Sequence, residues 1–146
     1  MGAVRIEESV EIARPPAEVW AAIADYSLDQ RWRDGLTDMT PDPPGGPEPG
    51  TKVHEVVRSS VSDFVADTVV TRLDPGSSYD FEGAGTIGRV AGGRTVAPNG
   101  AGSVFTYRIE LEPSGAMRLL RPLLGPVVRS GLRKDLARLR VLLEGG

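Results

Sequence analysis

The sequence contains no cysteine and a single histidine, His54, among its 146 residues. Disulfides, zinc–thiolate sites, iron–sulfur clusters and thiol nucleophiles are therefore excluded. One imidazole cannot build a zinc site with several histidine ligands, and a serine–histidine–aspartate triad would have to use His54. We accordingly expect no metal site and no cofactor.

Long apolar runs are also missing. No stretch reaches the roughly 18 residues of a membrane-spanning helix, and the N-terminus lacks the apolar stretch of a signal peptide. The net charge of −3 gives no overall attraction to nucleic acid or to anionic membranes. We expect a cytoplasmic protein with no transmembrane segment and no nucleic-acid partner.

What is present is typical of a globular protein, with 40% hydrophobic and 25% charged residues. A chain of 146 residues is long enough for one self-sufficient core and too short for a two-domain enzyme. We expect a single domain over residues 1–146.

The N-terminal region reads as a strand followed by two short helices. Residues 4–13 alternate between apolar and polar side chains, as a half-buried strand requires, and Glu8 alone breaks the pattern. Pro15 and Pro16 then end the strand and fix the first turn of a helix. The buried stripe of that helix would consist of Val19, Trp20 and Ile23. Residues 25–32 predict a second short helix or turn.

The middle of the chain predicts a loop and then a series of hairpins. Residues 34–50 carry five prolines and three glycines beyond Gly35, so we expect a long loop, either a functional cover or a disordered connector. The turn signals Asp74-Pro75-Gly76 and Asn99-Gly100 separate strand-like segments. These segments cover residues 51–59, 63–73, 78–84, 87–97 and 102–112.

Residues 114–144 repeat leucines at helical spacing, which predicts a long amphipathic helix, kinked where Pro122 and Pro126 remove backbone donors. A single sheet and a single long helix bury their apolar faces best when the sheet curls around the helix. The predicted fold class is α+β, with a curved antiparallel sheet of about six strands wrapped around the C-terminal helix.

The run from Val10 to Trp20, with Asp25 and Trp32, resembles the opening of the START-like superfamily. This superfamily is also called the polyketide cyclase and lipid-transport, or Bet v 1-like, group. The similarity continues through Pro49-Gly50-Thr51, Leu73-Asp74-Pro75 and Gly102-Ser103-Val104 to the closing Leu142-Leu143-Glu144. The resemblance implies a helix-grip fold whose sheet and long helix enclose a cavity for an apolar small molecule.

The resemblance implies a binding protein or an enzyme. The leading hypothesis is a carrier that binds a hydrophobic or aromatic small molecule, such as a lipid or a polyketide, without covalent chemistry. The alternative is a polyketide cyclase or aromatase, in which Arg94 and Tyr107 would stabilise enolate oxygens and His54 would act as base. A chaperone-binding or regulatory module is a third hypothesis, and a homodimer is left open.

Aromatic residues that share one face of a strand are the expected lining of the cavity. A tyrosine hydroxyl buried there needs a hydrogen-bond partner, and a ligand oxygen could be that partner. The expected lining residues are Tyr26, Trp32, Tyr79, Phe81, Phe105, Tyr107, Leu120 and Leu124. Tyr26, Arg94 and Tyr107 are the expected polar groups inside. The strand register at His54 is ambiguous, and an outward, structural orientation is favoured because no orienting partner can be assigned.

Two further patterns each allow two interpretations. Gly83, Gly85 and Gly88 match the dinucleotide fingerprint, but no helix opens at the third glycine, so we interpret them as positions where strands bend. The segment 114–144 carries seven basic and two acidic residues, which predicts a solvated helix face. The alternative for this helix is contact with anionic lipid or with an acidic carrier protein.

Overall fold

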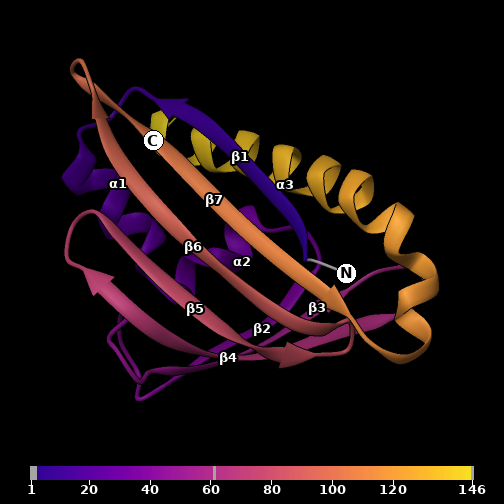
Figure 1. The fold of residues 1–146 in the computed structure, drawn as a ribbon. Coiled ribbons are helices and arrows are strands. Elements are labelled where there is room, and N and C mark those ends of the chain that lie inside the picture. Colours follow the sequence, from indigo (N-terminus) through magenta and orange to yellow (C-terminus); the bar gives the residue numbers. More distant parts are fainter. Residues whose placement is uncertain (1–2, 61, 146) are drawn as a thin grey trace.

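The computed structural model describes residues 3–60 and 62–145, and its centre is one antiparallel sheet of seven strands in the order β1-β7-β6-β5-β4-β3-β2 (Figure 1). Every neighbouring pair of strands runs antiparallel. The strands are β1 (Val4–Ile12), β2 (Leu36–Asp42), β3 (Lys52–Arg58), β4 (Asp63–Asp74), β5 (Ser78–Gly85), β6 (Gly88–Asn99) and β7 (Gly102–Pro113). The first and last strands in the sequence therefore lie side by side.

The helices follow β1 and β7, as the sequence predicts. The first group consists of α1 (Pro16–Ile23), the 3-10 turn η1 (Tyr26–Leu28) and α2 (Asp29–Trp32). The 3-10 segment η2 (Gly115–Leu120) leads into α3 (Arg121–Glu144), which packs along β1 and against α2. No helix in the described ranges is long and apolar enough to cross a membrane. The α+β, helix-grip fold class is thus confirmed.

The helix α3 contains two prolines, and their positions decide how each affects the helix. Pro122 lies in the first turn, where a helix does not need its missing N–H, and Pro126 lies inside α3 without ending it. The preceding residues of the predicted helix form the separate segment η2. The C-terminal helix therefore begins at Arg121, later than residue 114.

The expectation of an unbroken loop over residues 34–50 is wrong, because Leu36–Asp42 forms β2. Pro41 lies within this strand, opposite Val53 of β3. An edge strand has a neighbour on one side alone, so a residue without an N–H is tolerated there. β2 is one of the two edge strands of the sheet. The sheet therefore has seven strands, one more than the roughly six that the sequence predicts.

Gly83 and Gly85 occupy β5, at positions where a side chain would collide with β4. A Cβ atom at Gly83 would lie 2.0 Å from the carbonyl oxygen of Asp67, and one at Gly85 would lie 1.8 Å from that of Val65. Gly88 opens β6 instead of a helix. The glycines of this pattern therefore allow close packing of inner strands, which is a different role from the predicted bend.

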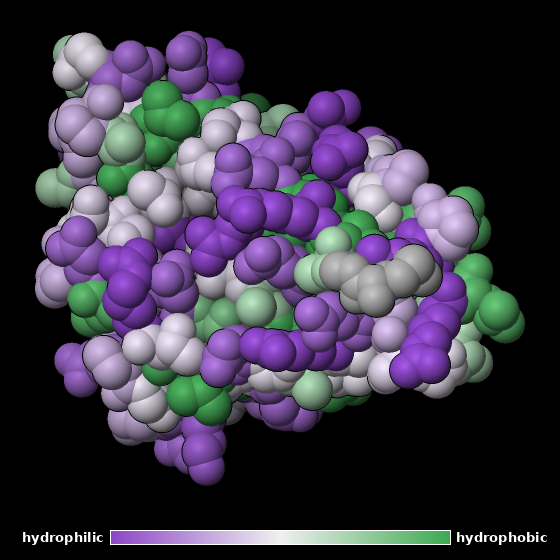
Figure 2. All heavy atoms as spheres, viewed as in Figure 1, coloured by the Kyte–Doolittle hydropathy of each residue, from purple (hydrophilic) through white to green (hydrophobic). Residues whose placement is uncertain are grey.

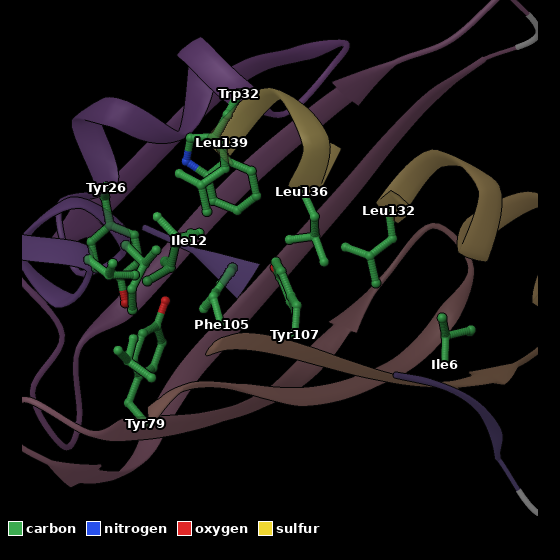
Figure 3. Close-up of a cluster of buried hydrophobic side chains, with 14 of the residues drawn as sticks. Ile6, Ile12, Tyr26, Trp32, Tyr79, Phe105, Tyr107, Leu132, Leu136 and Leu139 are labelled. Carbon is green, nitrogen blue, oxygen red and sulfur yellow. The ribbon is translucent and has the colours of Figure 1, made fainter. Parts of the chain in front are cut away.

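The core lies between α3 and the face of the sheet that carries Phe105 and Tyr107. Figure 3 shows Leu132 and Leu136 of α3 directed toward the sheet, with Leu136 next to Tyr107 of β7. The buried leucines of α3 are Leu124, Leu132, Leu136 and Leu139. Trp32 packs edge-to-face on Phe105, with ring centroids 6.1 Å apart, and its exposed fraction is 1%. This tryptophan is at the centre of the core.

The predicted buried stripe of α1 is correct for two of its three residues. Val19 and Ile23 are fully buried, whereas Trp20 is partly exposed and packs from the side on Tyr79. The helix places Trp20 at the margin of the core because α1 covers only the end of the sheet. Trp20 is thus a lateral contact of the core.

Candidate functional site

A fully buried ion pair joins α2 to β6 in the middle of the core. The exposed fractions of the Arg94 and Asp29 side chains are 1% and 0%. The guanidinium donates two hydrogen bonds to the carboxylate, Nη1 to Oδ1 at 3.1 Å and Nη2 to Oδ2 at 2.5 Å. Nη1 also donates to the carbonyl oxygen of Ile23 at 2.9 Å. Such bidentate geometry is the form in which a buried charge pair is tolerated.

The turn before α2 places Asp29 at this point. The side chain of Asp25 accepts hydrogen bonds from the backbone N–H of Ser27 at 3.0 Å and from its hydroxyl at 2.6 Å. This cap fixes η1, which leads directly into α2. A local sequence signal therefore sets the position of a carboxylate that meets its partner 65 residues later.

A second arginine extends the ion pair toward the edge of the sheet. Arg33 Nη1 lies 3.2 Å from Asp29 Oδ2, and Arg33 Nη2 lies 2.5 Å from Glu55 Oε2 on β3. The side chains of Arg33 and Glu55 are 13% and 17% exposed. We call Arg94, Asp29, Arg33 and Glu55 the inner charge cluster. It contains two cations and two anions, so its formal charges cancel.

Aromatic rings surround the Arg94 end of the inner charge cluster. The guanidinium carbon lies 4.7 Å from the ring centroid of Tyr107 and 5.1 Å from that of Trp32. Burial is the largest single influence and lowers the pKa of Arg94, but the carboxylate of Asp29 together with Tyr79 and Tyr107 raises it by more, so the pKa lies above its usual range. Arg94 is therefore a permanent cation held between π faces, where such contacts are favourable.

Two tyrosines of the site, Tyr26 and Tyr79, stay protonated at neutral pH. Burial raises the pKa of Tyr26 to about 12 and raises the pKa of Tyr79 well above its usual range. Figure 3 shows both hydroxyl groups directed into the same part of the core. The hydroxyl of Tyr107 accepts a hydrogen bond from Arg94 Nη2 at 3.4 Å. The site thus offers neutral hydroxyls beside a fixed positive charge.

Three buried polar atoms of this region have no hydrogen-bond partner among the described residues. They are the hydroxyl of Tyr26, Nε1 of Trp32 and Nε of Arg94. Indole and guanidinium N–H groups only donate, and a tyrosine hydroxyl can donate as well. Leaving a buried donor unsatisfied costs about 1–3 kcal/mol. All three atoms can therefore bind an acceptor oxygen.

The space beside Tyr26 and Arg94 is almost filled by side chains. A partly open void of about 10 Å³ remains, which is about the room that one water molecule needs. Its lining consists of Tyr26, Met39, Val53, Glu55, Thr68, Tyr79, Phe81, Arg94 and Tyr107. Pockets for small molecules typically measure about 300–1,000 Å³. The described residues thus surround a partly open void, with a mainly apolar lining, that is smaller than any such ligand.

The structure brings some of the predicted lining residues together and separates others. Tyr26, Tyr79, Phe81 and Tyr107 line the void together with Arg94. Trp32 and Phe105 pack beside it in the core. Leu124 is buried near the start of α3, and Leu120 is 42% exposed at the end of η2, and neither lines the void.

Sequence reasoning missed two kinds of site residue. Asp29 and Arg33 lie in a charged stretch, and no local pattern marks them as buried. Met39 falls in the segment expected to be a loop. Val53 and Thr68 could have been found by strand parity, since they lie opposite each other on β3 and β4. Apolar residues occur at both odd and even positions of this segment, which left the orientations of Val53 and His54 open.

His54 lies on the outer face of the sheet, opposite to Arg94 and Tyr107. Its neighbour Val53 faces the void, so alternation directs the imidazole outward, where the side chain is 43% exposed. Nδ1 lies 2.6 Å from Asp67 Oδ1, and this hydrogen bond raises the pKa of His54. The structure therefore brings Arg94 and Tyr107 together without His54.

Comparison with solved structures shows the same fold in proteins of low sequence identity. TTHA0849 from Thermus thermophilus superposes with a TM-score of 0.80 at 16% identity, over 95% of this chain and 96% of that one. The KanY protein gives 0.74 at 20% identity over 99% of both chains. Ara h 8.0201 gives 0.73 at 15% identity over 99% of this chain and 100% of its own. At these identities the likeness establishes the fold alone.

Sequence comparison identifies the family. A search of curated protein sequences finds no significant match. The family model described as polyketide cyclase / dehydrase and lipid transport matches residues 3–144, nearly the whole chain. The motifs in the sequence, the helix-grip fold and this match agree, and the chain belongs to the polyketide cyclase/dehydrase and lipid-transport family.

Proposed function

We propose that the chain binds a largely apolar small molecule that carries an acceptor oxygen, with that oxygen against Arg94. The family implies binding of a hydrophobic small molecule. The observation that carries the finer proposal is the set of three unsatisfied donors, on Tyr26, Trp32 and Arg94, in an otherwise aromatic core. A ketone, phenol or carboxylate oxygen would satisfy donors that the protein itself leaves unpaired.

Binding requires the core to open, because the void of about 10 Å³ holds no such ligand. Met39 is the most adaptable side chain around the void, since an unbranched thioether has three rotatable bonds. It lies on β2, which pairs with β3 alone. Displacing β2 breaks one ladder of hydrogen bonds, whereas displacing any inner strand breaks two. We expect the ligand to enter beside β2.

Matched probes test this proposal. Naphthoic acid carries an acceptor carboxylate, and methylnaphthalene has nearly the same shape without it. We expect one molecule of naphthoic acid to bind per chain, with the dispersed NMR spectrum of a folded protein retained. Tyr26→Phe and Trp32→Phe should each weaken its binding by roughly 3- to 10-fold, the usual contribution of one hydrogen bond. Binding of methylnaphthalene should be the same in Tyr26→Phe as in the parent, because this variant removes only the hydroxyl group.

The Tyr26→Phe variant also provides an internal check on folding. Removing an unsatisfied buried hydroxyl should leave the stability of the Tyr26→Phe protein unchanged or raise it by up to about 1 kcal/mol. Arg89→Gln, on the exposed side of β6, is the matched control and should not affect either probe. Binding of several probe molecules per chain, or equal losses for both probes, would contradict the proposal.

A second function, a cyclase or dehydratase, is favoured by the contact between Arg94 and Tyr107. A fixed cation and a neighbouring hydroxyl can stabilise the oxyanion of an enolate as it forms. This version of the enzyme would work without His54. Incubation with a poly-ketone mimic distinguishes the two functions, since a carrier gives no turnover. An enzyme should turn over, and Tyr107→Phe should lower its rate by about 10²–10³-fold.

A further inference from the structure

Three aliphatic side chains project from the molecule where the C-terminal helix begins. The exposed fractions of Leu119, Leu123 and Val127 are 84%, 58% and 65%. Leu123 and Val127 are one helical turn apart on α3, and Leu119 precedes them by the same interval. We call these three residues the outer ridge. Figure 2 shows hydrophobic side chains protruding at the end of the molecule where α3 starts in Figure 1.

The outer ridge is separate from the core contacts of α3. The helix buries Leu132, Leu136 and Leu139 against the sheet. The ridge lies on the other side of the same helix, so α3 has two apolar faces and the sheet covers one of them. Clustered exposed aliphatic residues of this kind mark contact sites for proteins or membranes.

Positive charge surrounds the outer ridge. Residues 115–134 contain five basic side chains and no acidic one. A shallow surface groove beside the ridge is lined by Pro126, Arg129, Ser130, Arg133 and Lys134. Glu8 of β1 reaches this region and contacts Arg129 and Arg133, which leaves the local balance positive. Glu8 is also the residue that breaks the apolar alternation of the first strand.

The rest of the molecule has the opposite charge. Residues 1–114 carry ten basic and 18 acidic side chains, so the chain as a whole is at −3 while its C-terminal helix is strongly positive. An anionic surface would attract the helix and repel the sheet, which orients the molecule with the outer ridge facing that surface. Contact between the ridges of two copies is disfavoured, because both ridges are surrounded by positive charge.

We propose that the start of α3 docks on an anionic phospholipid bilayer. The outer ridge inserts among the lipid headgroups, and the basic side chains around it lie at the level of the phosphates. A protruding group of flexible aliphatic side chains flanked by arginine and lysine fits a fluid interface, which needs no complementary groove. This inference does not depend on the internal binding site.

Vesicle binding tests the proposal. The full chain should sediment with vesicles of equal parts phosphatidylcholine and phosphatidylglycerol and should stay in solution with pure phosphatidylcholine. Arg118→Gln with Lys134→Gln should weaken binding by about 25-fold, since one basic residue near an anionic surface contributes roughly five-fold. Leu123→Ser should weaken it by about ten-fold. Added salt should weaken the parent as well.

Matched substitutions elsewhere control for the changes in charge and hydropathy. Arg31→Gln with Lys52→Gln removes the same charge outside the basic segment, and Val141→Ser removes an exposed aliphatic side chain from the far end of α3. Both controls should retain most of the binding. Three results would overturn the proposal: no binding to the anionic vesicles, equal losses in test and control variants, or a dimer in sedimentation velocity that Leu123→Ser dissociates.

Discussion

Two charged clusters on opposite faces of the same sheet differ in what surrounds them. The inner charge cluster pairs Arg94 with Asp29 at exposed fractions of 1% and 0%. On the outer face, His54 and Asp67 form an equally short contact, 2.6 Å, with exposed fractions of 43% and 68%. An exposed pair contributes roughly 0–1 kcal/mol, whereas breaking a buried pair costs about 3–5 kcal/mol. Distance alone therefore does not rank these two contacts.

The two ion pairs also have different roles in the fold. His54 and Asp67 lie on the adjacent strands β3 and β4, which backbone hydrogen bonds already hold together. Asp29 and Arg94 connect α2 to β6, whose backbones share no ladder. The buried pair thus positions α2, and with it Trp32, over the centre of the sheet. The polarity of the candidate binding site comes from the same pair.

The largest effect should follow from removing one member of the buried pair. Asp29→Ala leaves the Arg94 guanidinium without its carboxylate inside the core, and we expect the free energy of unfolding to fall by about 3–5 kcal/mol. Asp67→Ala on the outer face should lower it by less than about 1 kcal/mol. Urea denaturation of both variants measures the comparison.

A double variant sharpens this test. Asp29→Leu combined with Arg94→Met replaces both charges by apolar groups, so no uncompensated charge stays buried. Its loss of stability should be smaller than that of Asp29→Ala alone. A loss of stability below about 1 kcal/mol in Asp29→Ala would mean that water reaches Arg94. Solvent would then screen the inner charge cluster as it screens the pair of His54 and Asp67.

Most of the fold could be predicted because its signals are local. The turn sequences Asp74-Pro75-Gly76 and Asn99-Gly100 mark hairpins, and they lie between β4 and β5 and between β6 and β7. β2 was missed because its proline argues against a strand, and only the sheet order shows that this strand is an edge. An edge position is a property of the complete sheet, which no local window contains.

The residues of the candidate site also fall into two groups, those that a local sequence pattern predicts and those that it does not. Strand parity predicts that Tyr79 and Phe81 share a face, and both line the void. Nothing local distinguishes Asp29 from the exposed charges around it, because its burial depends on Arg94, which is 65 residues away. Leu120 shows the reverse case, since it continues a leucine-rich pattern and is nevertheless exposed. Periodicity identifies a helix face and does not say whether another element covers it.

The two tryptophans give the second comparison, with a smaller expected difference. Trp32→Ala removes a ring that is 1% exposed and should lower the free energy of unfolding by about 3–5 kcal/mol. Trp20→Ala removes a partly exposed ring with an edge contact to Tyr79, so its loss should be smaller by at least about 1 kcal/mol. Urea denaturation provides both values. Equal losses would place Trp20 in the core after all.

The smallest effect concerns the pair of His54 and Asp67 on the outer face of the sheet, and it appears as a pH dependence of stability. The hydrogen bond to Asp67 raises the pKa of His54 above its ordinary value of 6.5. Because the folded-state pKa lies above the unfolded one, protonated His54 contributes stability that is fully present below about pH 6.5. This contribution is lost as the pH rises through the folded-state pKa. Since the pair is exposed, the change in stability should stay below about 1 kcal/mol.

NMR titration of the imidazole resonances separates this pair from its neighbours. Asp67→Asn removes the charged acceptor at 2.6 Å and should lower the pKa of His54 toward 6.5. Asp38→Asn is the matched control, because its carboxylate lies 3.9 Å from Nε2 and should change the pKa less. Neither variant should affect naphthoic acid binding, since His54 lies across the sheet from Arg94. A loss of binding in Asp67→Asn would show that the outer face communicates with the core, and the contrast between the two clusters would fail.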